Sequence, residues 1–387
     1  MKKDKLTYAE LINLFTIFMF TFIQYTKNNF SVFCETYHLK YILVLIVVFF
    51  DLIMINKHYG KINSRDNDKY KYEFNNILKF IVIIFVISMA LQIKNGFNSF
   101  LFSEILYLLV PLVFSLMIIK TTNKDVGQII NIIFYWYIIL FFIKNYSSFT
   151  INNIKTISFE NSYSPFESGL SNAFYLFEFY YLVKGDNKKA FFSMIFSFFS
   201  LKRISALFCI IQFITIPILK KSKISGVKIS KKMLVCSVIA FTVITLLMNL
   251  FYQPETASYF SNKFGINLNE ITLDRYDRTY FIIENIDRIN QGLGSTTEFL
   301  TKYYGKTRLA ARNLHNDLLR IYYECGIIGL ISMIYYLFKM SQKNIYSFIL
   351  MFSLLINSLF NHYFLGAGVA ESWIVLCLLI YWINNES

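Results

Sequence analysis

The segment RLAARNLHNDLLR holds the residues whose types and spacing are best suited to chemistry. In a helix, Arg308, Arg312 and His315 fall at positions i, i+4 and i+7 and form one stripe. A histidine with an unperturbed pKa of about 6.5 can accept a proton near neutral pH. Because like charge on neighbouring arginines disfavours protonation, we expect His315 to be a neutral general base. The alternative is an interfacial histidine beside Asn316 or Asp317, either of which can cap the following helix.

Two further groups of cations are suited to binding an anion. Lys202 and Arg203 lie in the sequence SLKRIS between two apolar runs. Arg275 and Arg278 are three residues apart, on one face of a helix if this segment is helical. A guanidinium offers phosphate oxygens a bidentate fork that a lysine lacks. The alternatives are a snorkelling pair at a helix end for the first group and a solvated face, neutralised by adjacent aspartates, for the second.

The elements that position these side chains are apolar helices. Hydrophobic residues make up 56% of the 387 residues and charged residues only 16%, below the roughly one quarter typical of soluble domains. The apolar residues form continuous blocks, and about 18 or more of them cross a bilayer core of ~30 Å. We predict one all-α transmembrane domain over 1–387 with 10–12 spans. The predicted spans are 9–25, 38–55, 77–93, 100–119, 126–143, 168–184, 189–201, 204–219, 233–251, 316–338, 345–360 and 366–383.

The lysines and arginines predict the orientation of these spans. With the N-terminus in the cytoplasm, the cytoplasmic segments hold about 22 Lys and Arg, against about 7 in the short loops of the other side. This asymmetry places both termini in the cytoplasm, and the sequence MKKDKL precedes a first span without a small-residue cleavage site, so we expect that span to stay attached. The net charge of +14 then suits anionic lipid heads, and we expect no nucleic acid as partner.

One long loop, residues 252–314, interrupts the spans and is predicted to lie outside the cytoplasm. Loops of this length among short connections are usually functional. Its sequence favours an amphipathic helix over 280–289, followed by a Gly-x-Gly turn at Gly292 and Gly294. Without a preceding strand this turn is not a nucleotide-binding fingerprint.

Ionisable residues within the apolar runs are functional candidates by default. Arg320 and Glu324, at i and i+4, are predicted to form a structural ion pair, with catalysis as the alternative. Glu178 and Asp51 also lie in apolar runs. His362 follows the span 345–360 and is on the correct side to approach His315.

The absence of several motifs excludes some classes of reaction. The sequence has no P-loop for ATP-driven transport, no HExxH and no acidic metal-binding cluster on the outer side. The five cysteines show no CxxC spacing, and four lie in apolar runs, so they predict neither a disulfide nor a metal site. We therefore expect no cofactor and no metal.

With these motifs in place, the chain resembles the O-antigen polymerase and O-antigen ligase superfamily, the Wzy-type bacterial membrane glycosyltransferases. The matching features are 10–12 spans with one large late outer loop, a Lys-Arg pair that opens a middle span (SLKRISALF), an arginine followed by a helix and a Gly-x-Gly turn (DRTYFIIENIDRINQGLG), and an Asn/His segment that enters a span with Gly-x-x-Gly (HNDLLRIYYECGIIGL). The resemblance in architecture covers most of the chain, and the resemblance in motifs covers some sixty residues.

The resemblance implies a GT-C-like fold of the lipid-linked-sugar transferases, with the active site at the outer leaflet under the loop. It implies that Arg203 binds the polyprenyl diphosphate, that Arg278 or alternatively Arg275 is the loop arginine, and that His315 is the base or positions the acceptor. Lys202 and Arg312 are predicted to add substrate-binding charge.

The expected function is that of a glycosyltransferase that polymerises repeat units of O-antigen, in lipopolysaccharide, or of capsule. Its donor would be an oligosaccharide linked to undecaprenyl diphosphate, its other partners membrane lipid and a chain-length regulator, and its location a bacterial cytoplasmic (inner) membrane. Two alternatives stay open. One is a ligase that passes the glycan to lipid A core or another acceptor, and the other is a flippase or transporter of lipid-linked oligosaccharide, although no internal repeat favours transport.

Overall fold

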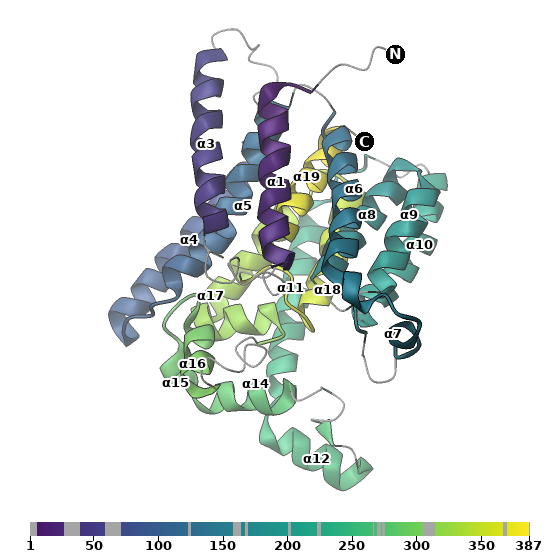
Figure 1. Ribbon diagram of the computed structural model, residues 1–387. Helices are drawn as coiled ribbons and strands as arrows, with labels where there is room; N and C mark the ends of the chain where they lie inside the picture. Colours follow the sequence, from purple (N-terminus) through teal and green to yellow (C-terminus); the bar gives the residue numbers. More distant parts are fainter. Residues whose placement is uncertain are drawn as a thin grey trace.

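The computed structural model describes most of the chain (Figure 1). The described residues are 6–26, 39–58, 71–122, 125–157, 164–166, 169–199, 203–222, 226–265, 267, 268, 272, 275–304, 314–366 and 370–386. Within these ranges every regular element is helical, which confirms the predicted all-α class.

Every one of the predicted apolar segments coincides with a helix. These helices are α1 (Tyr8–Thr26), α3 (Leu39–His58), α4 (Lys71–Asn95), α5 (Leu101–Thr121), α6 (Val126–Asn145), α8 (Leu170–Lys184), α9 (Asn187–Phe199), α10 (Arg203–Lys221), α11 (Lys231–Phe251), α17 (Asp317–Met340), α18 (Ile345–Ser358) and α19 (Ala370–Asn385). The apolar runs therefore predict the positions of the helices well, because a helix satisfies most backbone groups of an apolar segment internally.

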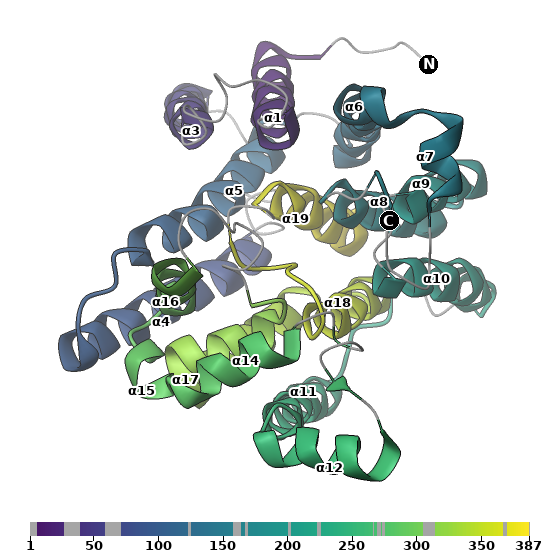
Figure 2. The same cartoon turned by 60° about the horizontal axis from the view of Figure 1, so that its bottom comes forward.

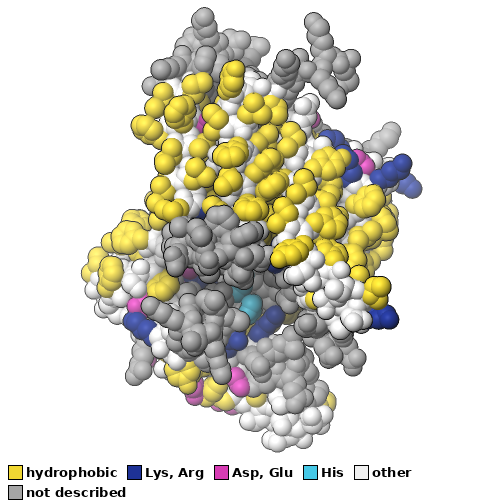
Figure 3. Space-filling view, viewed as in Figure 1, with side chains coloured by type: hydrophobic (Ala, Val, Ile, Leu, Met, Phe, Trp, Pro, Cys, Tyr) yellow, Lys and Arg dark blue, Asp and Glu magenta, His cyan; other side chains and the backbone are white. Residues whose placement is uncertain are grey.

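Seven of the described helices are long and apolar enough to cross a membrane, so the chain is a multi-pass membrane protein. They are the segments Tyr8–Thr26, Asn75–Asn95, Leu101–Thr121, Val126–Ser148, Ile204–Lys221, Lys231–Phe251 and Asp317–Met340. Large exposed apolar side chains, such as Phe15 and Leu247, cover their outer faces, and Figure 3 shows this apolar surface in yellow.

Four of the predicted spans correspond to helices that are too short to cross the membrane, although the prediction counted them among the 10–12 spans. Helices α8, α9, α18 and α19 have 15, 13, 14 and 16 residues. At about 1.5 Å per residue, none of them crosses ~30 Å of hydrocarbon alone. Two of these helices are central rather than peripheral, because α8 is buried from Leu170 to Val183 and α19 from Ala370 to Ile383.

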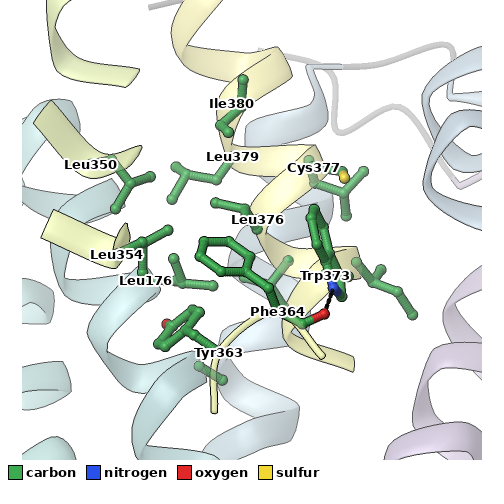
Figure 4. Packing of buried hydrophobic residues seen from close by; sticks show 14 of the residues in the cluster. Leu176, Leu350, Leu354, Tyr363, Phe364, Trp373, Leu376, Cys377, Leu379 and Ile380 are labelled. Atoms are coloured by element: carbon green, nitrogen blue, oxygen red, sulfur yellow. Dashed lines mark hydrogen bonds between the residues drawn. The ribbon is translucent and has the colours of Figure 1, made fainter. Parts of the chain in front are cut away.

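The core between α8, α18 and α19 is apolar and closely packed. Figure 4 shows Leu176 of α8, Leu354 of α18 and Leu376 of α19 around the turn that joins α18 to α19. The indole of Trp373 donates a hydrogen bond of 2.8 Å to the carbonyl of Phe364. This bond fixes the turn against the first residues of α19.

The two ends of the bundle differ. At one end, where α1 begins and α19 ends, Asn13 of α1 donates to Thr121 at the end of α5 (2.9 Å), and Glu386 accepts from the amide of Val126 (3.0 Å). At the opposite end, the lower one in Figure 1, lie α12 (Pro254–Phe264), α14 (Arg275–Glu284), α15 (Ile286–Ile289) and α16 (Ser295–Tyr304). Figure 2, which brings this end forward, shows α14, α15 and α16 beside α17.

The helix predicted over 280–289 differs from the observed elements. Helix α14 begins five residues earlier, at Arg275, and ends at Glu284. Asn285 separates it from the short α15. The short α7 (Ile151–Lys155) and α16 were not predicted, because their sequences are short and mixed in polarity.

The Gly-x-Gly turn packs directly against the bundle. Gly292 has φ +86°, and a Cβ there would lie 2.7 Å from the Cα of Ser88 in α4. The Ser88 hydroxyl accepts from the amide of Leu293 (3.0 Å), and Asn98 donates to the carbonyl of Leu293 (2.8 Å). Only glycine combines this backbone conformation with this approach.

We predict that Gly292→Ala destabilises the fold more than Gly226→Ala. Gly226 has a similar φ of +82° but open space around its missing Cβ. Both substitutions carry backbone strain of about 1–2 kcal/mol, and the contact with Ser88 adds roughly 1–3 kcal/mol at Gly292 alone. Thermal unfolding of the detergent-purified variants measures the difference; equal losses would contradict the close packing.

Candidate functional site

A buried ionic cluster joins α5 to α17 at the end of the bundle that carries the loop. The guanidinium of Arg320 lies 2.8 Å from the carboxylate of Glu104 and 3.0 Å from that of Glu324. All three side chains are almost completely buried. The predicted pair of Arg320 and Glu324 is confirmed, and Glu104 is a second counter-charge that the sequence analysis missed.

Glu324 also holds the Gly-x-Gly turn of the loop. Its carboxylate accepts from the amides of Gly294 (2.8 Å) and Thr296 (3.1 Å) and from the hydroxyl of Thr296. Its backbone carbonyl accepts from the amide of Gly292 (2.9 Å). That carbonyl is available because α17 is interrupted at Gly326, which has φ +69° and ψ −172°. The cluster therefore connects loop and bundle through one residue.

His315 lies immediately before α17. The side chain of Asn316 caps this helix by accepting from the amide of Leu319 (2.9 Å), and the helix begins at Asp317. The prediction that His315 is the last member of a helical stripe is therefore wrong, because α17 begins only at Asp317, two residues after His315. Arg308 and Arg312, the other members, lie outside the described residues.

A second histidine packs against the first. The ring centroids of His315 and His362 are 4.5 Å apart, with 38° between the ring planes. Nδ1 of His362 lies 3.6 Å from Oδ1 of Asp317, whose other carboxylate oxygen accepts from the amides of Tyr363 (2.6 Å) and Phe364 (2.7 Å). The turn between α18 and α19 thus brings His362 to the start of α17.

Arg275 approaches the same turn from the loop. Its Nη1 donates to the carbonyl of Phe360 (2.7 Å), two residues before His362. Arg278 is one turn further along α14 and is half-buried. Both arginines of the predicted pair are therefore on a helix, as the prediction required, and Arg275 is in contact with the turn that carries His362.

The start of α10 lies at the same end of the bundle. Arg203 is the first residue of α10, and two residues later the hydroxyl of Ser205 accepts from Asn357 of α18 (3.0 Å). Asn357 in turn accepts from Asn361 (2.8 Å), the residue before His362. The backbone of Arg203 and the two histidines are thus joined by successive contacts, whereas the side chain of Arg203 and all of Lys202 lie outside the described part.

These groups suit two chemical tasks. The guanidinium of Arg275 provides positive charge for an anion, and imidazoles accept and release protons near neutral pH. Figure 3 shows histidine side chains in cyan among dark-blue Lys and Arg side chains, just below the yellow apolar surface. The arrangement therefore lies at the edge of the apolar surface of the bundle.

The sequence places His362 on the correct side to approach His315, but nothing in the sequence shows that the two residues are in contact. Its contact with His315 depends on the turn between α18 and α19, which Asp317 and Trp373 fix through backbone groups. The sequence could have indicated Glu104 as a candidate, since it is a lone acidic residue inside an apolar run. In the described residues, no group of three or more His, Cys, Asp or Glu side chains is arranged to hold a metal ion.

No family model matches the chain, and no curated protein matches it either. What the fold establishes is a helical multi-pass membrane protein with a buried ionic cluster and a pair of histidines at one end of the bundle.

We predict that Arg320→Met strongly destabilises the protein. It leaves the carboxylates of Glu104 and Glu324 buried without a counter-charge, which costs about 3–5 kcal/mol. Adding Glu104→Gln and Glu324→Gln removes those charges and should recover part of the loss. Denaturant unfolding in detergent measures both.

The matched control is Lys302→Met. It removes the exposed bridge of Lys302 to Glu298 (2.7 Å) and should change stability by less than about 1 kcal/mol. An Arg320→Met variant as stable as this control would show that the buried cluster does not hold α5 and α17 together.

Proposed function

We propose that the chain is a metal-independent glycosyltransferase that polymerises repeat units of a bacterial surface polysaccharide. It would transfer the growing glycan from undecaprenyl diphosphate to an incoming lipid-linked unit. One observation carries the proposal: Arg275, His315, His362 and the first residue of α10 are brought to one end of an apolar helix bundle from four separate parts of the chain. The resemblance of the motifs to Wzy-type polymerases and O-antigen ligases supports it.

The chemistry follows from the substrate. The bond between the anomeric carbon and the diphosphate oxygen breaks, and its electron pair stays on the diphosphate. A new bond forms between that carbon and a hydroxyl oxygen of the acceptor sugar, and the hydroxyl proton moves to His315. Cations near the diphosphate stabilise the charge that develops on it, and a positioned base typically contributes a factor of about 10²–10⁴.

Arginines are suited to replace a metal ion in the first of these roles. Arg203 and either Arg278 or Arg275 would grip the diphosphate through bidentate bonds, and Lys202 and Arg312 would add charge. Arg275 gives one of its five N–H groups to Phe360, and this bond fixes the direction of its guanidinium.

The proposal places this end of the bundle on the non-cytoplasmic side. The distribution of about 22 Lys and Arg against about 7 in short loops supports this orientation. A donor that carries its own energy as a glycosyl diphosphate suits that side, where ATP is absent. The proposed fold is the GT-C-like arrangement of 10–12 spans, with the short helices α8, α9, α18 and α19 counted among them.

We predict that Ser261→Cys, in α12, reacts with a membrane-impermeant maleimide in intact cells, whereas Lys228→Cys, before α11, reacts only after permeabilisation. Both positions are exposed. Wild-type protein gives the labelling background, because Cys236 of α11 is exposed, whereas Cys209, Cys325 and Cys377 are buried. The reverse labelling pattern would place the histidines in the cytoplasm and end the proposal.

We predict that His315→Ala lowers the polymerisation rate by a factor of about 10²–10⁴, because the acceptor hydroxyl loses its base. The assay supplies the purified protein with lipid-linked repeat units alone and follows chain length. His58→Ala is the control, since it removes a histidine that no part of the proposed site contains. Near-normal polymerisation by the His315 variant would remove its catalytic role.

The same assay separates the two loop arginines and the rival functions. Arg→Lys keeps the charge but loses the fork, so the diphosphate-binding arginine is the one of Arg275 and Arg278 whose lysine variant loses more activity. A ligase would lengthen no chain without a second acceptor. A flippase would move the lipid-linked unit across proteoliposomes without forming any bond.

A further inference from the structure

His362 lies in a turn whose backbone is fixed on both sides. The amides of Tyr363 and Phe364 donate to one carboxylate oxygen of Asp317. The hydroxyl of Tyr363 donates to the carbonyl of Asn172 in α8 (2.7 Å). The position of the His362 ring is therefore set by α8 and α17 together.

The remaining oxygen of Asp317 is directed at this ring. Oδ1 lies 3.6 Å from Nδ1 of His362, and the Asp317 side chain is fully buried. Arg320, one turn further along α17, interacts electrostatically with Asp317 but is itself paired with Glu104 and Glu324. The carboxylate of Asp317 is thus held at one edge of the His362 ring.

The other neighbour of His362 is His315, at 4.5 Å between ring centroids. From the loop, Arg275 of α14 is in contact with the backbone at Phe360 and adds positive charge to this side. Two imidazoles this close oppose each other's protonation, so their titrations belong to the pair. The order Asp317, His362, His315 follows the logic of a carboxylate that orients one imidazole and stabilises its charged form.

We propose that His362 is a positioning and proton-relay residue for His315, held in place by Asp317. The relay step rests on the proposed function: the proton that His315 takes from the acceptor hydroxyl passes to His362, whose cation the Asp317 carboxylate stabilises, and then leaves to solvent. The coupling between the two imidazoles does not depend on which substrate is transferred.

Histidine-selective NMR of the full chain in detergent tests the coupling directly, since the sequence contains only four histidines. In His362→Gln, we expect the titration midpoint of His315 to rise by about one pH unit, because the neighbouring cation is gone. In Asp317→Asn, the midpoint of His362 should fall, because the carboxylate no longer favours its charged form. The variant His58→Gln, at the last residue of α3, should leave both midpoints unchanged.

Coupling is reciprocal, so His315→Gln provides a second measurement if His362→Gln fails to fold. The midpoint of His362 should then rise as well. An unchanged midpoint of the remaining histidine in either folded variant overturns the inference.

Activity separates the inference from the proposed function. With lipid-linked repeat units, His362→Gln should lower kcat, leave KM near the wild-type value and displace the pH profile. If wild-type protein forms no glycan but the two histidines titrate together, the proposed function fails and the pair stands. If wild-type protein polymerises and the histidines titrate independently, the proposed function stands and the relay is wrong.

Discussion

The arrangement of this end of the protein depends on one buried cation. Arg320 is paired with Glu104 of α5 and with Glu324 of its own helix, and all three side chains are buried. A buried ion pair adds little net stability, but it constrains the geometry of the residues around it, because a displacement leaves a buried charge without its partner. Glu324 has a second set of donors in the Gly-x-Gly turn. The loop, α5 and α17 are therefore held in one relative position.

That fixed position is what allows three distant segments to share a site. Asp317 begins α17 one turn before Arg320, and it holds the turn after α18 by two backbone bonds. The turn carries His362 to His315 and offers a carbonyl to Arg275. The polar groups of the proposed site are thus supported by backbone contacts and buried carboxylates, which restrain side-chain motion more than exposed ion pairs do.

The positions of the helices could be predicted from the sequence, because long apolar runs such as that of α11 have few stable alternatives to a helix in a bilayer. The pair of Arg320 and Glu324 followed from its i, i+4 spacing, which is a local property. Glu104 could not be assigned to it, since the contact depends on how α5 packs against α17. His315 was placed on a helix because its spacing matched one, whereas the local cap at Asn316 decided otherwise. The roles proposed for the arginines remain predictions, and Lys202 and Arg312 lie outside the described residues.

The interruption of α17 at Gly326 divides this helix into two helical segments. The outer part, from Asp317 to Cys325, is bonded to the loop through Glu324 and to the turn after α18 through Asp317. The inner part packs within the bundle. The break at Gly326 therefore lets the outer part take the direction set by its bonds to α4, α5 and the loop, while the inner half follows the packing of the bundle.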